Sequence, residues 1–219
     1  MSTEQFNQEI VIVAAKRTPM GGFQGSLSGV TSPSLAATAI KALLADTQVA
    51  GDKVDEVLMG CVLPAGLGQA PARQATLGAG LPLSVGATTV NKVCGSGMKT
   101  VMLAHDLLKA GSAKLVVAGG MESMSNVPYY ASNMRWGNKY GNVQLLDGLA
   151  KDGLTDVYDG QAMGIAAELC ASTCGISRED QDAFAYASHQ KALAAIQAGH
   201  FSAEISPYEV IGKSADLAG

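Results

Sequence analysis

Short apolar runs alternate with segments of helical spacing along the first 120 residues of the chain. The apolar runs predict strands at residues 9–15, 54–62, 83–93 and 115–120. Helical spacing predicts helices over residues 32–45, 70–78 and 98–108. The last pattern, which includes Met98 and Met102, is mostly apolar, so we expect that helix to be buried. Residues 9–15 are apolar almost throughout, which is typical of a strand covered on both faces. Strands that alternate with helices in this way predict an α/β layered domain built on a mixed β-sheet.

The pattern changes at Met121. A long stretch to Asp159 shows no regular period and carries five of the eleven aromatic side chains. A loop this long in a compact protein is usually functional or part of an interface. Helical spacing returns over residues 161–174 and 178–198, and residues 205–211 could add an edge strand. We therefore predict two domains, residues 1–120 and residues 121–219.

The chemistry of the first domain centres on Cys94. It lies where a β-branched run, Thr88–Val93, gives way to a helical pattern. The first N–H groups of a helix lack internal partners and carry partial positive charge, which favours the nucleophilic thiolate. Gly95 and Gly97 bear no side chains, so another molecule could approach. The alternative from spacing alone is an inert cysteine that fills a core.

Two other motifs partly match the same stretch, and in each case one residue differs from the motif's pattern. A phosphate-binding loop needs a glycine directly before Lys99-Thr100, where Met98 stands. A hydrolase nucleophile elbow around Ser96 needs a glycine at the position that Cys94 occupies. The cysteine is therefore the candidate nucleophile.

Composition narrows the function classes. The 219 residues are 47% hydrophobic and 16% charged, with a net charge of −4. There is no basic block, so we expect no nucleic-acid partner, and no apolar run is long enough to span a bilayer. The sequence suggests no metal site.

The cysteines and the first residues bear on the compartment. Four cysteines (Cys61, Cys94, Cys170 and Cys174) in a chain this size favour free thiols in a reducing cytoplasm. Cys170 and Cys174 lie one helical turn apart, and we interpret both as small core residues. The polar, acidic N-terminus is unlike a secretory or mitochondrial presequence, which also favours the cytoplasm.

Several stretches, taken in order, resemble one family. Residues 90–97 (Val-Asn-Lys-Val-Cys-Gly-Ser-Gly) are similar to the nucleophile segment of thiolases, in particular of acetyl-CoA C-acetyltransferases. Further similar stretches lie at residues 13–19, 66–74, 118–125, 151–156, 162–164 and 178–182. Together they extend over nearly the whole chain, which makes them far more specific than a lone cysteine. The resemblance implies that Cys94 is the nucleophile.

The resemblance also implies a fold and a binding site. Thiolases have a five-layered αβαβα core made of two similar halves, with a loop domain that binds coenzyme A. This chain resembles the first half and most of the loop domain. By family position, Leu154 and Met163 would line the pantetheine or acyl pocket, and His189 would contact the nucleotide end. Ala162 replaces the histidine that often precedes Met163 in the family.

The second half of a thiolase supplies a histidine, an asparagine and a second cysteine, in segments that do not occur in this sequence. The resemblance therefore implies a ping-pong, reversible Claisen condensation or thiolysis of short 3-ketoacyl-CoA through an acyl-Cys94 intermediate. The backbone N–H of Cys94 would form part of an oxyanion hole. No cofactor is implied, because the coenzyme A thioesters acetyl-CoA and acetoacetyl-CoA are substrates. The complete protein would be a homo-oligomer, a dimer or a tetramer.

Two alternatives remain open. A β-ketoacyl synthase usually has an alanine before the cysteine and serines after it, and Val93 and Gly95 disagree with that pattern. A non-catalytic truncated product or partner subunit that binds acyl-CoA would explain the missing second half. Because the acid–base residues of the second half do not occur in this sequence, we expect this chain alone to lack thiolase turnover.

Overall fold

The computed structural model describes residues 9–210 of the chain. These form two compact units, residues 9–128 with 206–210 and residues 129–205. The polar N-terminus and the end of the predicted strand at 205–211 lie outside the described residues. Residues 206–210 do not form a strand, contrary to the prediction for that part.

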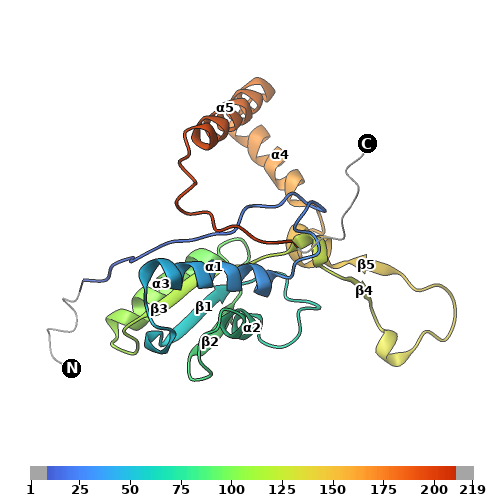
Figure 1. Ribbon diagram of the computed structural model, residues 1–219. Helices are drawn as coiled ribbons and strands as arrows, with labels where there is room; N and C mark the ends of the chain where they lie inside the picture. Colours follow the sequence, from blue (N-terminus) through green and yellow to red (C-terminus); the bar gives the residue numbers. More distant parts are fainter. Residues whose placement is uncertain (1–8, 211–219) are drawn as a thin grey trace, which may run out of the picture. The chain divides into compact units, whose positions relative to one another are not determined.

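A three-stranded sheet forms the centre of the first unit (Figure 1). The strand β1 (Glu56–Gly60) lies between β2 (Gly86–Val90) and β3 (Val116–Gly120). Both pairings are parallel and in register, so Gly60 at the end of β1 lies opposite the last residue of each neighbour. The sheet expected to be mixed is parallel in these three strands. The carboxyl ends of all three therefore meet at one edge.

Helices cover both faces of this sheet, which confirms the predicted α/β layering. On one face, α1 (Ser32–Thr47) and α2 (Pro71–Gly78) share a buried apolar cluster with Val57 and Met59 of β1. On the other face, α3 (Ser96–Lys109) packs on β1 and β3. Short 3₁₀ turns occur at Gly51–Lys53 and Met124–Asn126.

The helix α3 buries a different face from the one its apolar pattern predicts. The residues that it buries against the sheet are small, namely Ser96, Thr100 and Ala104. Met98 and Met102, expected in the core, are 74% and 53% exposed. Small side chains bring the helix backbone close to the sheet, and the larger apolar side chains form a second face without a partner among the described residues.

The predicted strand at residues 9–15 is wrong for this structure. The segment is extended but pairs with no strand, and Val11, Ile12 and Val13 are 65%, 82% and 67% exposed. Among the described residues, the outer edges of β2 and β3 stay free in this sheet, and the run pairs with neither of them.

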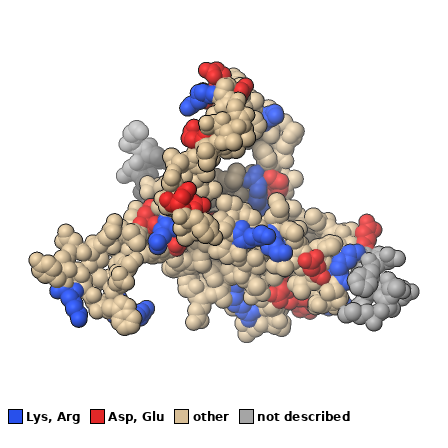
Figure 2. Space-filling view, turned by 180° about the vertical axis from the view of Figure 1, so that it is seen from behind, with Lys and Arg blue, Asp and Glu red and all other residues tan. Residues whose placement is uncertain are grey.

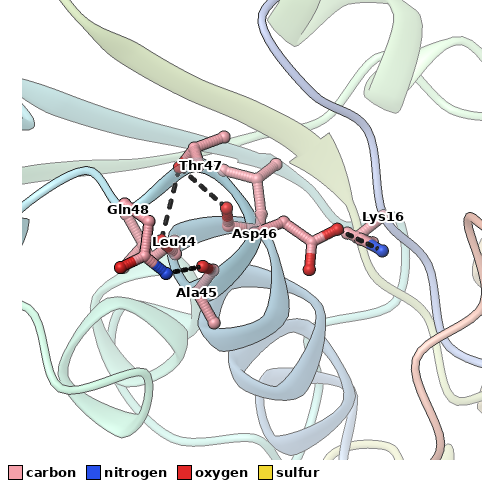
Figure 3. Close-up of polar contacts among 7 residues, drawn as sticks. Lys16, Leu44, Ala45, Asp46, Thr47 and Gln48 are labelled. Atoms are coloured by element: carbon pink, nitrogen blue, oxygen red, sulfur yellow. Dashed lines mark hydrogen bonds and ion pairs between the residues drawn. The ribbon is translucent and has the colours of Figure 1, made fainter.

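The segment that follows this run is tied to the end of α1 (Figure 3). Lys16 Nζ lies 2.5 Å from Asp46 Oδ2, with the lysine side chain 14% exposed. Thr47 Oγ1 donates to the Leu43 carbonyl oxygen at 2.9 Å, and Gln48 Nε2 donates to that of Ala45 at 2.5 Å. The Ala45 carbonyl lies among the last four of the helix, which have no helical partner, and Gln48 supplies one. These contacts fix the last turn of α1 and the chain beside it.

The second unit begins with an antiparallel ribbon, where the sequence predicts irregular structure. Its strands are β4 (Tyr129–Ala131) and β5 (Leu145–Asp147), joined through a 3₁₀ turn at Met134–Trp136. A π-helical turn follows at Ala150–Leu154, and Tyr130 donates to Asp152 Oδ2 in that turn at 2.6 Å. This hydrogen bond raises the pKa of Tyr130 to about 12. This hydrogen bond thus connects the ribbon to the π-helical turn.

Two predicted helices complete this unit. They are α4 (Met163–Cys174) and α5 (Arg178–Gln197). The predicted cap of α5 is confirmed, because Ser177 and Asp180 form a reciprocal capping box. Neither helix buries a residue, so Cys170 and Cys174 are exposed and the prediction that they are core residues is wrong.

Acidic and basic side chains are interspersed over the face drawn in Figure 2, where the described residues show no continuous basic area. Among residues 9–210, no helix is long and apolar enough to cross a membrane. Within the same range, no cluster of three or more His, Cys, Asp or Glu side chains could hold a metal ion.

Candidate active site

Cys94 lies between β2 and α3, at the sheet edge where the three strands end. It is exposed and forms an isolated bridge with Lys92, and the helix begins two residues later at Ser96. The strand–turn–helix setting expected from the sequence is therefore present. The role of Cys94 as a nucleophile stays a prediction.

The turn that carries Cys94 holds a valine in an unusual backbone conformation. Val93 has a φ of 47°, in the left-handed region that β-branched residues rarely adopt. For an ordinary L-residue this conformation costs roughly 1–2 kcal/mol, so surrounding contacts must hold it.

Two side chains supply those contacts. Asn91 Oδ1 accepts a hydrogen bond from the Val93 N–H at 2.9 Å. Ser96 Oγ accepts from the Lys92 N–H at 2.8 Å and donates to the Val93 carbonyl oxygen at 2.5 Å. Ser96 is 3% exposed, so its two bonds are partly shielded from water, whereas the bond between Asn91 and Val93 is exposed. The backbone N–H groups of Gly95 and Ser96 are also used within the turn, by the carbonyl groups of Lys92 and Val93.

Three glycines bring the start of α3 onto the strand ends. A Cβ added to Gly60 would lie 2.6 Å from Gly97 N, and one added to Gly120 would lie 3.4 Å from Gly97 Cα. The Thr100 hydroxyl, fully buried, donates to the Gly119 carbonyl oxygen at 2.9 Å. Gly97 therefore serves helix–sheet packing, and the prediction that it leaves room for a ligand is wrong.

A carboxylate holds the loop that follows β1. Glu122, two residues after β3, accepts from the Val62 N–H at 2.8 Å and from the Leu63 N–H at 3.0 Å. It also lies 3.6 Å from the Cys61 sulfur. Burial, followed by the charge of Glu122, raises the pKa of the Cys61 thiol to about 11. Cys61 is therefore a neutral thiol near pH 7, unlike a reactive cysteine.

The second unit contains the other predicted site residues. Leu154 and Met163 flank the bridged pair Thr155 and Ala162, so the chain brings these two residues to neighbouring positions. Both are partly exposed, at 41% and 51%. His189 lies on the separate helix α5 and is exposed. A substrate-binding role for these three residues stays a prediction.

The turn between Leu154 and Met163 is organised by one acidic residue. Asp156 Oδ1 accepts from the N–H groups of Tyr158 and Asp159 at 2.8 and 3.1 Å. Its backbone carbonyl accepts from Gly160, whose φ of 72° suits glycine. This turn, together with Asn91, Ser96 and Glu122, was not singled out from the sequence. Asn91 and Asp156 each accept from the N–H two residues further on, which is a local signal, the Asx turn.

Similarity to known proteins gives separate evidence about the family of this chain. The family model described as "Thiolase, N-terminal domain" matches residues 10–218. The chain belongs to the thiolase family. Because the match crosses both units, residues 129–205 are also part of this thiolase domain.

Three relatives show how much of a thiolase the chain represents. An acetyl-CoA acetyltransferase of Schizosaccharomyces pombe is 54% identical, over 93% of this chain and 52% of that protein. A mitochondrial acetyl-CoA acetyltransferase B of Xenopus laevis is 52% identical, over 94% of this chain and 48% of its own length. A cytosolic acetyl-CoA acetyltransferase of Gibberella zeae is 50% identical, over 93% of this chain and 51% of that protein. The chain thus spans about half the length of the curated relatives it matches.

Proposed function

We propose that this chain is the acyl-carrying half of an acetyl-CoA acetyltransferase. The observation that carries the proposal is the 54% identity to such an enzyme over 93% of the chain. The exposed Cys94 at the start of α3 supports it. The thiolase match also favours this chemistry over that of a β-ketoacyl synthase.

The proposed reaction is a two-step exchange at the Cys94 sulfur. The thiolate attacks the carbonyl carbon of acetyl-CoA, the carbon–sulfur bond to coenzyme A breaks, and coenzyme A leaves as a thiol with one proton. A second acetyl-CoA loses an α-proton to a base, and its carbanion attacks the acyl-Cys94 carbonyl. Acetoacetyl-CoA leaves and the cysteine is regenerated. The Cys94 N–H donates to the oxyanion that forms in each step.

Proton transfer must come from groups outside this half. His105 is eleven positions beyond Cys94, and at 1.5 Å per residue it lies roughly 16 Å away along the helix. It is exposed and contacts Asp106 instead. We therefore assign the base for Cys94 and the group that removes the α-proton to the half of a thiolase that this chain does not match.

The remaining assignments concern binding and location. We propose that residues 121–219 form the coenzyme A-binding domain, with Leu154 and Met163 toward the pantetheine or acyl group and His189 toward the nucleotide. The assembled protein would be a homo-oligomer. We propose a cytoplasmic location, which the four free cysteines favour, although the relatives' names include both cytosolic and mitochondrial proteins. Imaging of a tagged full-length protein would test the location.

A second candidate function follows from the same coverage. A chain that spans half of its relatives could bind acyl-CoA, or pair with another chain, without turning over. It would then bind acetyl-CoA and form no covalent adduct.

Thiolysis of acetoacetyl-CoA tests the proposal. We expect no turnover by the 219-residue chain alone, turnover when a thiolase second half is joined to it or mixed with it, and an acetyl adduct on the Cys94 peptide. A Cys94→Ser variant in the complemented enzyme should lose both turnover and adduct. Binding of acetyl-CoA without any adduct in the complemented protein would support the second candidate, and turnover by the chain alone would overturn the division of roles.

A further inference from the structure

The peptide group between Val62 and Leu63 is held from two sides at the sheet edge that carries Cys94. Its N–H, that of Leu63, donates to Glu122 Oε1 at 3.0 Å, and its carbonyl oxygen, that of Val62, accepts from Asn91 Nδ2 at 3.2 Å. Glu122 follows β3 and Asn91 follows β2, whereas Val62 follows β1. One peptide therefore connects the chain segments that leave all three strands.

The same asparagine reaches the turn of Cys94. While its amide nitrogen binds Val62, its Oδ1 accepts from the Val93 N–H at 2.9 Å. Val93 is the residue with the left-handed backbone, and Cys94 is its direct neighbour. A continuous series of hydrogen bonds thus runs from the Glu122 carboxylate through Val62 and Asn91 to the residue before the thiol.

This series explains how a valine stays in a conformation that suits glycine. The Val93 N–H is bound by Asn91, and its carbonyl oxygen is bound by Ser96. If Asn91 released the N–H, the backbone of Val93 could relax toward extended or right-handed values, which would rotate Cys94 away from its exposed position.

We propose that Asn91 and Glu122 are positioning residues for Cys94. Glu122 fixes the Val62 peptide, and Asn91 uses that peptide as an anchor to hold Val93 left-handed and the thiol exposed. The inference rests on the proposed function, because it explains how a nucleophile at Cys94 is presented. Neither residue touches the reacting atoms in this scheme.

Matched controls separate positioning from general support of the fold. Asn126 also donates its amide to a backbone carbonyl, that of Val30 at 2.9 Å, but lies outside the 91–96 turn. Asp55 also accepts from two consecutive backbone N–H groups, Lys114 and Leu115, but at the opposite edge of the sheet. Asn126→Ala and Asp55→Asn therefore remove the same kinds of bond without touching Cys94.

The experiment measures alkylation of each cysteine by iodoacetamide in the 219-residue chain, with peptide mass mapping. Each Cys94 rate is divided by that of Cys170, which is exposed in the other unit. We expect Asn91→Ala and Glu122→Gln to lower this ratio by up to about tenfold, the effect of one lost hydrogen bond. Asn91→Asp keeps the oxygen that binds Val93, so its ratio should lie between that of the wild type and that of Asn91→Ala. The two control variants should leave the ratio unchanged.

Thermal unfolding of every variant accompanies these rates. If Asn91 and Glu122 only supported the fold, all the variants would unfold earlier and the ratio would stay constant, which would overturn the proposal. The near-isosteric Asn91→Asp and Glu122→Gln variants keep the test valid if Asn91→Ala does not fold. In the complemented enzyme, we expect a lower kcat with an unchanged KM for acyl-CoA.

The same data distinguish this proposal from the function on which it rests. If wild-type Cys94 in the complemented enzyme reacts no faster than Cys170 and Cys174, the proposed function fails. If wild-type Cys94 is fast and Asn91→Ala is equally fast, only the positioning role fails.

Discussion

At the scale of single residues, the surroundings of Cys61 and Cys94 give the two thiols different reactivities. Cys61 is 1% exposed, and its pKa is raised to about 11 by burial and by Glu122. Cys94 is exposed on a turn that its neighbours hold rigidly. Reactivity should therefore follow position rather than residue type.

We expect alkylation of the complemented enzyme to label Cys94 first and Cys61 last. At pH 8, a thiol with a pKa of about 11 is ionised in roughly one molecule in a thousand. In the complemented enzyme, acetyl-CoA should protect Cys94 and leave Cys170 and Cys174 unprotected. Peptide mapping checks both points. Preferential labelling of a cysteine other than Cys94, or no protection of Cys94, would refute the assignment.

Asp55 predicts a pH dependence of stability. The N–H groups of Lys114 and Leu115 lower its pKa below the usual value of 3.8. The carboxylate therefore stabilises the fold above the unfolded-state pKa, and this contribution disappears as the pH falls through the lower folded-state pKa. We expect Asp55→Asn to unfold at lower urea concentration than wild type at pH 6, and the gap to close in strong acid.

Urea titrations from pH 7 to strong acid would measure this gap. Asp46→Asn is a suitable comparison, because that carboxylate binds a lysine side chain rather than backbone N–H groups. A constant gap between wild type and Asp55→Asn at every pH would show that the ionised carboxylate is not what stabilises the loop.

At the scale of elements, the sequence predicted where most helices and strands lie but not which face each one buries. Helical spacing identified α3, yet the helix buries Ser96, Thr100 and Ala104 and exposes Met98 and Met102. The close approach at Gly60 selects small residues for the sheet side, and hydrophobicity alone does not reveal that selection. The run at residues 9–15 has strand propensity, but propensity alone does not pair it with a strand of the sheet.

In the candidate site, too, the sequence predicted the local features but not the long-range contacts. Cys94 and its strand–turn–helix setting were predictable because they depend on local sequence. Asn91 and Glu122 act through Val62, which is 29 positions before Asn91 and 60 before Glu122. Contacts of that range depend on strand order, which periodicity does not give.

The ribbon β4–β5 predicts a role in assembly. Its connection exposes large aromatic side chains, with Trp136 at 82% and Tyr140 at 97%. An exposed apolar patch of this kind marks an interaction site. We expect that replacing residues 132–144 by a short glycine–serine linker will reduce the oligomer of the complete protein, as measured by light scattering. An unchanged mass would contradict the assembly role, and a Trp136→Ser, Tyr140→Ser variant would separate side-chain contacts from loop length.

At the scale of the whole molecule, the 219-residue chain should associate with itself. The unpartnered face of α3 comprises Met98, Val101 and Met102, which are 74%, 46% and 53% exposed. We expect light scattering of the isolated chain to show mass that rises with concentration. Met98→Lys with Met102→Lys should suppress that rise and weaken complementation by a thiolase second half.

A matched pair of exposed apolar residues on the other unit serves as the control. Leu169 and Ile165 are 68% and 53% exposed on α4. Lysine at those two positions should leave complementation intact. If it abolishes complementation as strongly as the α3 variant does, the covered surface is not specifically that of α3.

The bare face of α3 also has a consequence for biosynthesis. In the full-length relatives, the region similar to this chain is the N-terminal domain and leaves the ribosome first. About as many residues again remain to be made, which at usual elongation rates takes on the order of ten to forty seconds. During that interval a nascent protein that contains this chain would expose the α3 face, which has no partner among the described residues. An apolar face exposed for that long favours non-native association.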